Sequence, residues 1–201
     1  MIYMSPQSSI TQNVSTKIWG QICTPTRWGS SIDNGRTWCM DNGVFSGQFN
    51  AHAFWQKLKK MRPYQASCVF VVAPDVVANA LATLDAFRYW GARIQAEGWP
   101  VAFVAQDGQE HHSLPPAWAY DALFIGGSTE WKMSQHALDL IAQAKALGKW
   151  VHVGRVNSQK RIAHFQLANV DSVDGTAVCF APSRESKKLK RQLVKRPLFT
   201  L

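Results

Sequence analysis

Short apolar runs that end on a polar residue or a glycine recur five times along this chain. Runs of this kind, without polar alternation, are typical of parallel strands that are covered on both faces. Because crossover connections make parallel strands point the same way, the residues that follow them converge on one face. The pattern predicts an enzyme whose site lies at that face. The runs and the residues after them are Val69–Ala73 with Asp75, Val101–Ala105 with Gln106-Asp107, Leu123–Ile125 with Gly126-Gly127, Val151–Val153 with Gly154-Arg155, and Val170–Val173 with Asp174.

The spacing of these runs predicts an α/β fold. Two earlier β-like runs, Lys17–Ile22 and Thr37–Met40, bring the expected number of strands to about seven. Such units wind into either a barrel or an open doubly wound sheet. Polar residues follow almost every strand, and no G-x-G-x-x-G motif opens a βαβ unit, so a small TIM-barrel-like fold is favoured. An incomplete barrel is the alternative to a complete one. Strands are expected at 68–73, 101–105, 122–125, 150–153 and 171–174, and helices at 50–61, 76–97, 133–147 and 158–168.

The size and composition of the chain fit one globular domain. Its 201 residues, 46% of them hydrophobic and 17% charged, are enough to bury a substantial core. We expect a TIM-barrel-like catalytic domain over 1–182 and a basic segment over 183–201. No apolar stretch approaches the roughly 20 residues that cross a bilayer, and no secretory signal opens the sequence. The protein is therefore expected to be cytoplasmic, without a membrane partner.

The cysteines are too far apart to indicate a disulfide framework or a structural zinc site. We expect them to be buried free thiols, with no metal and no cofactor. The adjacent His111-His112 pair beside Glu110 is interpreted as a solvated loop, with a metal site as the alternative. The four cysteines are Cys23, Cys39, Cys68 and Cys179.

The net charge of +9 is unevenly distributed. A basic stretch runs from Arg184 to Arg196, and a shorter one covers Lys57–Arg62. Clustered lysines and arginines favour a polyanionic partner such as nucleic acid, and a solubilising tail is the alternative. A last helix within Ser183–Lys195 would turn Leu189 and Leu193 inward and its basic side outward. The candidate phosphate contacts are Arg155, Lys187, Lys188, Lys190 and Arg191.

Two aspartates at strand ends are candidate catalytic residues. Asp174 ends the last strand and precedes a glycine, and Asp41 closes an early strand. Two carboxylates across a sugar, one as nucleophile and one for proton transfer, are the arrangement that breaks glycosidic bonds. Asp174 could instead cap a helix or turn a loop, and Asp75 could be the N-cap of the next helix.

A flat base is the ligand that the other strand ends favour. The Gln106 amide can both donate and accept hydrogen bonds, as the edge of a purine requires. The Gly126-Gly127 backbone is free of side chains that would keep a ring away. Three tryptophans in or near expected loops, Trp28, Trp38 and Trp131, either pack in the core or stack on a base, and Trp131 is the strongest candidate for stacking.

A family resemblance covers about residues 37 to 176. The order of the motifs DNG (41–43), APD (73–75), QDG (106–108), IGG (125–127) and VHVGRVNSQKRIAHFQLANVDSVDGT (151–176) resembles that of the tRNA-guanine transglycosylases and their DNA-acting 7-deazaguanine relatives. The resemblance implies a TIM barrel that exchanges guanine for a 7-deazaguanine base, in the cytoplasm of a bacterium or a phage-infected host cell.

The resemblance also implies roles for individual residues. Asp174 would be the nucleophile that attacks C1′ of the guanosine sugar, and Asp41 would handle the proton. Asp75 and Gln106, with the Gly126-Gly127 backbone, would bind the departing guanine or the incoming deazaguanine.

Departures from the family pattern shift the expected substrate. The family's zinc-binding cysteine cluster is absent, and Ser128-Thr129-Glu130-Trp131 replaces an apolar loop. RNA-recognition additions are missing as well, so DNA is favoured over tRNA. The alternatives are an N-glycosidase that hydrolyses the same bond and a non-catalytic nucleic-acid-binding or partner subunit, and a homodimer is left open.

Overall fold

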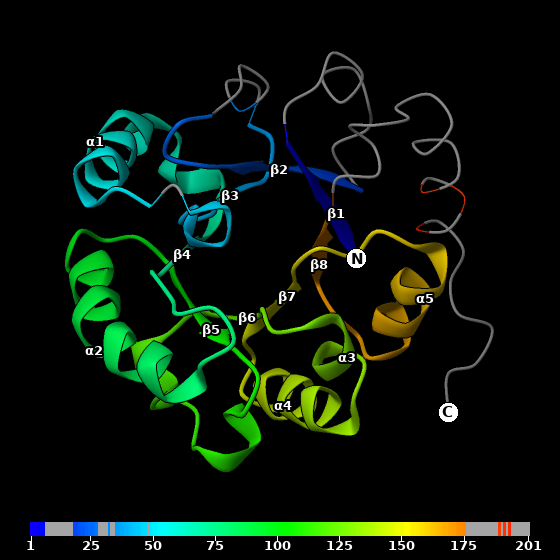
Figure 1. Cartoon of the computed structure of the whole chain (residues 1–201). Helices are drawn as coiled ribbons and strands as arrows, with labels where there is room; N and C mark the ends of the chain where they lie inside the picture. The colour runs from blue at the N-terminus through cyan, green and yellow to red at the C-terminus, as the bar shows by residue number, and fades with distance from the viewer. Residues whose placement is uncertain are drawn as a thin grey trace.

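Eight parallel strands close into a barrel in which each strand pairs with its neighbours in chain order and β8 pairs with β1 (Figure 1). The computed structural model describes residues 1–6, 18–27, 32, 35–47, 49–175, 189, 191 and 193. The α/β, TIM-barrel-like fold predicted from the sequence is confirmed, and the open doubly wound sheet is excluded. The strands are β1 (Ile2–Ser5), β2 (Trp19–Cys23), β3 (Trp38–Met40), β4 (Cys68–Val72), β5 (Val101–Ala105), β6 (Ala122–Ile125), β7 (Trp150–Val153) and β8 (Ser172–Asp174).

The first strand is the one that the sequence did not reveal. Strand β1 is four residues long and of mixed character, so that no apolar run marks it. It lies between β2 and β8, with Tyr3 opposite Trp19 and Met4 opposite Asp174. The expectation of about seven strands was therefore wrong, and the barrel is closed.

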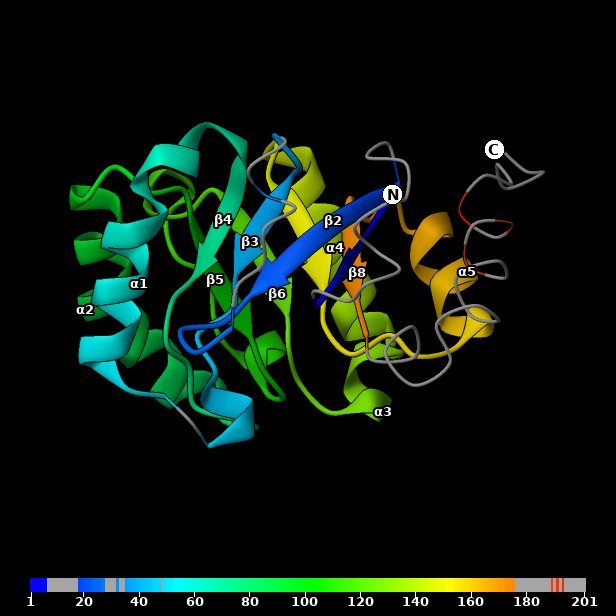
Figure 2. The ribbon, with the colours of Figure 1, turned by 90° about the horizontal axis from the view of Figure 1, so that it is seen from above.

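Helices lie around the outside of the barrel, as Figure 2 shows from a second direction. Each is capped by an asparagine or serine whose side chain accepts a backbone N–H, which satisfies a donor that the first turn leaves unpaired. The cap residues are Asn50, Asn79, Ser128, Ser134 and Ser158. The helices are α1 (Ala51–Met61), α2 (Ala80–Ala96), α3 (Thr129–Lys132), α4 (Gln135–Ala146) and α5 (Gln159–Leu167).

Helix α2 begins four residues later than the sequence predicted. Its N-cap is Asn79, and Ala78 before it has a positive φ of 58°. The alternative in which Asp75 caps this helix was therefore wrong. The residues between Asp75 and Asn79 form a loop at the mouth of the barrel, which leaves the Asp75 carboxylate available for other contacts.

Alternate residues of the strands face two different cores. Residues such as Val71 and Phe103 pack with helix side chains such as Phe87 and Ile141 in the outer core. Their neighbours in the strands form a separate cluster in the lumen, which is composed of Met4, Cys39, Phe70, Val72, Ala102, Val104 and Ala122. Because both faces are apolar, the strands show no polar alternation in the sequence.

The described cysteines are free thiols, as expected. Cys23 and Cys39 are buried and Cys68 is half-buried, whereas Cys179 lies outside the described residues. Burial raises the pKa of the Cys39 thiol well above its usual value, which keeps this thiol protonated and unreactive.

Part of the expected C-terminal helix is described. Leu189 and Leu193 are buried in the outer core and Arg191 is exposed, all in helical conformation, as the sequence predicted. The other proposed phosphate contacts of this segment, Lys187, Lys188 and Lys190, lie outside the described residues. Among the helices that are described, none combines the length and the apolar character needed to span a membrane.

Candidate active site

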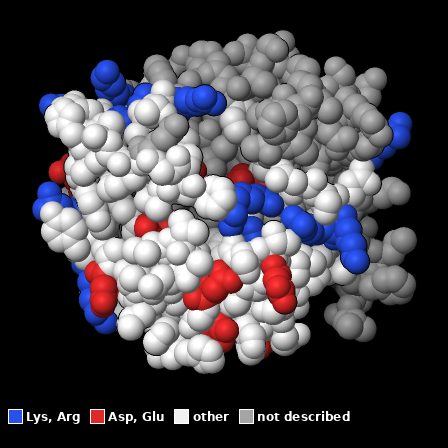
Figure 3. All heavy atoms as spheres, viewed as in Figure 1, with Lys and Arg blue, Asp and Glu red and all other residues white. Residues whose placement is uncertain are grey.

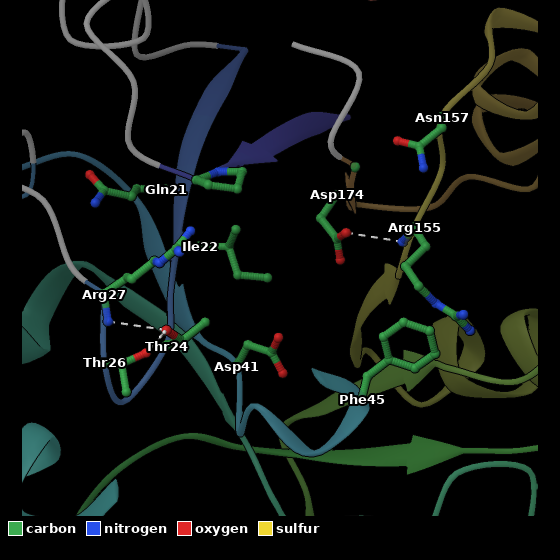
Figure 4. Close-up of a pocket in the computed structure, with 12 residues that line it drawn as sticks. Gln21, Ile22, Thr24, Thr26, Arg27, Asp41, Phe45, Arg155, Asn157 and Asp174 are labelled. Carbon is green, nitrogen blue, oxygen red and sulfur yellow. Dashed lines mark hydrogen bonds between the residues drawn. The ribbon is translucent and has the colours of Figure 1, made fainter. Parts of the chain in front are cut away.

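The structure brings the candidate residues together at the carboxyl ends of the strands. Six of them, Asp41, Asp75, Gln106, Gly126, Arg155 and Asp174, line two adjoining hollows, whereas Gly127 lines neither. The two hollows share Asp41, Phe45, Arg155 and Asp174. The two carboxylates of this set point into the same opening (Figure 4). The convergence expected from the strand endings is therefore present.

The inner hollow is small and mixed in character. Its volume is about 90 Å³, and its walls combine the polar residues Asp75, Gln106 and Gly126 with the apolar residues Val104 and Phe124. Apolar walls with a few convergent polar groups are typical of sites for small-molecule ligands.

The outer hollow is the larger of the two. Its volume is about 730 Å³, and Thr24, Thr26 and Arg27 line it on one side, with Asn157 on the other (Figure 4). The Asp41 and Asp174 carboxylates line both hollows.

Asp75 is held by two amide donors. Asn42 Nδ2 donates to Asp75 Oδ1 at 2.8 Å, and Gln106 Nε2 donates to Asp75 Oδ2 at 2.6 Å. Burial raises the pKa of Asp75, and the two amide donors oppose that rise. Asn42 itself is buried and also donates to the carbonyl of Ala73 at 2.9 Å. Asn42 is a site residue that sequence reasoning missed, although it stands next to Asp41 in the DNG motif.

Gln106 connects three loops of the mouth. Its Oε1 accepts hydrogen bonds from the backbone N–H groups of Ala78 (3.1 Å) and Gly127 (3.0 Å), while its Nε2 donates to Asp75. These contacts fix which end of the amide is oxygen and which is nitrogen, with the nitrogen on the Asp75 side. Asp107 supports the same region, because its carboxylate accepts the N–H of Ser128 at 2.7 Å.

Gly126 lines the inner hollow and lies close to Val104 and Gln106. A Cβ at this position would lie 2.8 Å from Val104 Cγ1 and 2.9 Å from Gln106 Nε2, which is closer than side chains normally approach. A methyl group there would occupy the hollow and displace the Gln106 amide.

We therefore expect Gly126→Ala to weaken the binding of free guanine by roughly tenfold or more, because one misplaced hydrogen-bonding group costs at least about 1.4 kcal/mol. Isothermal titration calorimetry with guanine measures this change. The control is Ser113→Ala, at an exposed position that lines neither hollow. Equal guanine affinity in the Gly126→Ala variant and the unmodified chain would show that the base does not enter the inner hollow.

The two shared carboxylates differ in their surroundings. Burial, followed by the nearby charge of Asp174, raises the pKa of Asp41 to about 6, against an ordinary value of 3.8. Asp174 is held by the Arg155 backbone N–H, which donates to Oδ1 at 3.0 Å, and by His152, whose Nε2 lies 2.9 Å from Oδ2. Paired titratable groups in unlike environments are typical of acid–base sites. His152 was not identified from the sequence.

Arg155 stands at the border between the hollows. It has a positive φ of 59°, an uncommon conformation for a residue other than glycine and one found at functional sites. Its guanidinium carbon lies 4.0 Å from the centre of the Phe45 ring, and Nη2 donates to the carbonyl of Gly127 at 2.5 Å. Phe45 is 60% exposed, so the pair forms an aromatic and cationic edge to the mouth.

Lys132 is a second cation beneath this edge. The side chain is buried, and its Nζ donates to the carbonyl of Gly154 at 2.6 Å. Burial, and then the nearby charge of Arg155, lower the pKa of Lys132 to about 8. On the mouth face, Lys and Arg side chains run from the centre toward α5, and acidic side chains lie over α3 and α4 (Figure 3).

Of the two alternatives for Trp131, packing in the core is the one that the structure shows, and stacking on a base finds no support. Trp131 is only 7% exposed, and its indole donates to Glu110 Oε2 at 2.8 Å. Trp38 is fully buried, and its indole donates to the carbonyl of Tyr64. Trp28 lies outside the described residues. The exposed aromatic ring at the mouth is that of Phe45.

The metal site considered for His111-His112 finds no support in the geometry. The Glu110 carboxylate binds the Trp131 indole, and His111 Nε2 lies 3.9 Å from its other oxygen. Within the described ranges, no three His, Cys, Asp or Glu side chains are grouped as metal ligands.

Fold and site together define a protein with a closed barrel of eight parallel strands, ringed by helices, and with two carboxylates at its carboxyl-terminal mouth. No model of a known protein family matches the chain, and no curated protein is significantly similar to it in sequence.

Proposed function

We propose that the protein is a guanine transglycosylase that exchanges guanine for a 7-deazaguanine base in nucleic acid, with DNA favoured over tRNA. The observation that carries this proposal is the position of Asp41 and Asp174. Both lie on the border between a hollow lined by base-binding groups and a larger hollow. A nucleotide with its base in the first hollow and its sugar-phosphate in the second would have its glycosidic bond at that border.

The groups of the inner hollow are complementary to guanine. The Watson–Crick edge of guanine presents N–H donors and the O6 acceptor. Ionised Asp75 accepts from the donors, and the second N–H of the Gln106 amide can donate to O6. Adenine carries an amino donor in place of O6, so the same groups would discriminate against it. Phe124 and Val104 provide the apolar contact that a ring requires.

The proposed reaction is a double displacement. The Asp174 carboxylate attacks C1′, the C1′–N bond breaks with its electron pair going to the base nitrogen, and protonated Asp41 supplies the proton that guanine takes up. The incoming base then gives its N–H proton to Asp41, and its nitrogen attacks C1′ to release Asp174. A pKa of about 6 suits Asp41 to both steps, because neutral and ionised forms are each accessible near neutral pH.

Features of the outer hollow support a polynucleotide as the substrate. Arg27 and Arg155 can contact phosphates, and Thr24 and Thr26 offer hydroxyl donors. A duplex would have to extrude its guanosine at a cost of a few kcal/mol, which stacking on the exposed Phe45 ring offsets in part.

The proposal is tested by mixing the protein with guanine-containing DNA, and separately with tRNA, in the presence of radiolabelled guanine. We expect label to enter the DNA. Release of unlabelled guanine without incorporation would identify an N-glycosidase instead, in which water replaces the incoming base. Binding of DNA with neither release nor incorporation would identify a non-catalytic subunit.

A further inference from the structure

We infer that Trp150, Ser172 and His152 form a hydrogen-bond chain of fixed direction inside the barrel, which positions Asp174 at the mouth. The hydrogen-bond chain runs from Trp150 to Asp174. Of its four side chains, Asp174 is the one that lines the hollows. Its geometry is independent of the reaction, whereas its catalytic effect rests on the function proposed above.

Three short contacts join the four side chains. Trp150 Nε1 donates to Ser172 Oγ at 2.8 Å, Ser172 Oγ lies 2.8 Å from His152 Nδ1, and His152 Nε2 lies 2.9 Å from Asp174 Oδ2. The strand register produces this arrangement, because His152 of β7 pairs directly with Ser172 of β8. The side chains of His152 and Ser172 are fully buried.

The direction of each bond follows from the chemistry of the groups. An indole N–H can only donate, so Ser172 Oγ accepts from Trp150 and its hydroxyl proton stays available for His152 Nδ1. An ionised carboxylate can only accept, so the Nε2 of His152 carries the proton that Asp174 receives. With that proton on Nε2, a neutral imidazole has a lone pair on Nδ1 for the Ser172 hydroxyl, whereas the opposite tautomer would leave two lone pairs facing each other at Asp174.

The rings around His152 hold the imidazole in place. The centroid of Phe124 lies 4.7 Å from that of His152, and the centroid of Phe70 lies 5.2 Å away. Both phenylalanine rings pack against the imidazole, and both of its nitrogens are hydrogen-bonded. Asp174 Oδ2 therefore has a donor whose position is fixed. The Arg155 backbone N–H fixes Oδ1 in the same way.

The same residue types could suggest a serine hydrolase, but the geometry excludes that reading. A nucleophilic serine must reach a substrate carbonyl, and Ser172 has no exposed surface. The Asp174 side chain is 16% exposed and borders both hollows. The reactive end of the chain is therefore the aspartate, and His152 and Ser172 are positioning residues behind it.

The tautomer is measured by NMR of the full chain labelled with ¹⁵N-histidine. We expect His152 to show a protonated Nε2 and an unprotonated Nδ1 that accepts a hydrogen bond. In Ser172→Ala, the Nδ1 signal should move toward that of a nitrogen without a donor. An Nδ1–H tautomer in the unmodified protein would overturn the inference. This result does not depend on any activity, so failure of the proposed function would leave it intact.

The positioning effect is measured by exchange kinetics. We expect Ser172→Ala and His152→Phe to lower kcat by about 10- to 100-fold, the order of the loss when outer hydrogen-bond partners of metal-bound side chains are removed, with KM for the DNA unchanged. Ser172→Thr, which keeps the hydroxyl, should restore much of the rate. The matched control Ser113→Ala changes an exposed serine and should have no effect. Unchanged kcat in folded Ser172→Ala and His152→Phe proteins would show that the chain serves stability alone.

Discussion

Asp174→Asn is expected to abolish base exchange, with a loss of kcat on the order of 10⁴-fold or more, as is usual when a covalent nucleophile is removed. An asparagine amide cannot form the glycosyl ester. Its side-chain oxygen can still accept the Arg155 N–H, but its NH2 group then faces His152 Nε2, so circular dichroism and urea unfolding are used to show that the variant is folded. Incorporation of radiolabelled guanine into DNA measures the effect.

The matched control for this variant is Asp139→Asn, the same atomic change at an exposed position of α4. It should exchange guanine at the rate of the unmodified chain. If Asp174→Asn retained more than a few per cent of that rate, Asp174 would not be the nucleophile, and the carboxylate at the mouth would have to act by electrostatics alone.

Asp41→Asn is expected to remove exchange activity while making the protein more stable at neutral pH. The pKa of Asp41 is raised from 3.8 to about 6 in the folded chain, chiefly by burial. The folded state therefore holds its proton more tightly than the unfolded state, and the free energy of unfolding falls as the pH rises between these two values. A difference of about 2 pKa units corresponds to about 3 kcal/mol at most.

Urea unfolding of both proteins at pH values from 3 to 8 checks this expectation. Below about pH 4 the unmodified protein and the Asp41→Asn variant should be equally stable, because Asp41 is then protonated in both states. Above about pH 6 the variant should be more stable by a constant amount. A stability difference that does not change with pH would contradict a raised pKa of Asp41 in the folded chain. The control Asp139→Asn should show no comparable gain between pH 4 and 6.

Much of the barrel could be predicted because its strands carry a simple signal. Strands β5 and β6 are apolar runs of the expected kind, with the bounds expected for them. Strand β1 could not be predicted, because four residues with a serine at the end, Ile2–Ser5, have no period and owe their burial to pairing with β2 and β8. The sequence also does not show which strand residues face the lumen and which face the outer core, because residues on both faces of the strands are mostly apolar.

The candidate site residues could be predicted where they follow a strand, but not where they lie within one. Asp41, Asp75 and Asp174 stand at or after strand ends, which marks them in the sequence. His152 and Ser172 lie inside strands, and only the register of β7 and β8 reveals that they meet. A histidine between two valines of an apolar run was a usable signal, because a polar group buried there must have hydrogen-bonding partners.

The most direct test of the central claim is to trap the covalent intermediate. The protein is incubated with a guanine-containing DNA oligonucleotide, quenched rapidly in acid and analysed by intact-mass and peptide mass spectrometry. The predicted result is an adduct with the mass of the oligonucleotide less its guanine, joined to the peptide that contains Asp174 and absent from Asp174→Asn. An adduct on any other residue, or guanine exchange that proceeds with no adduct at all, would contradict it.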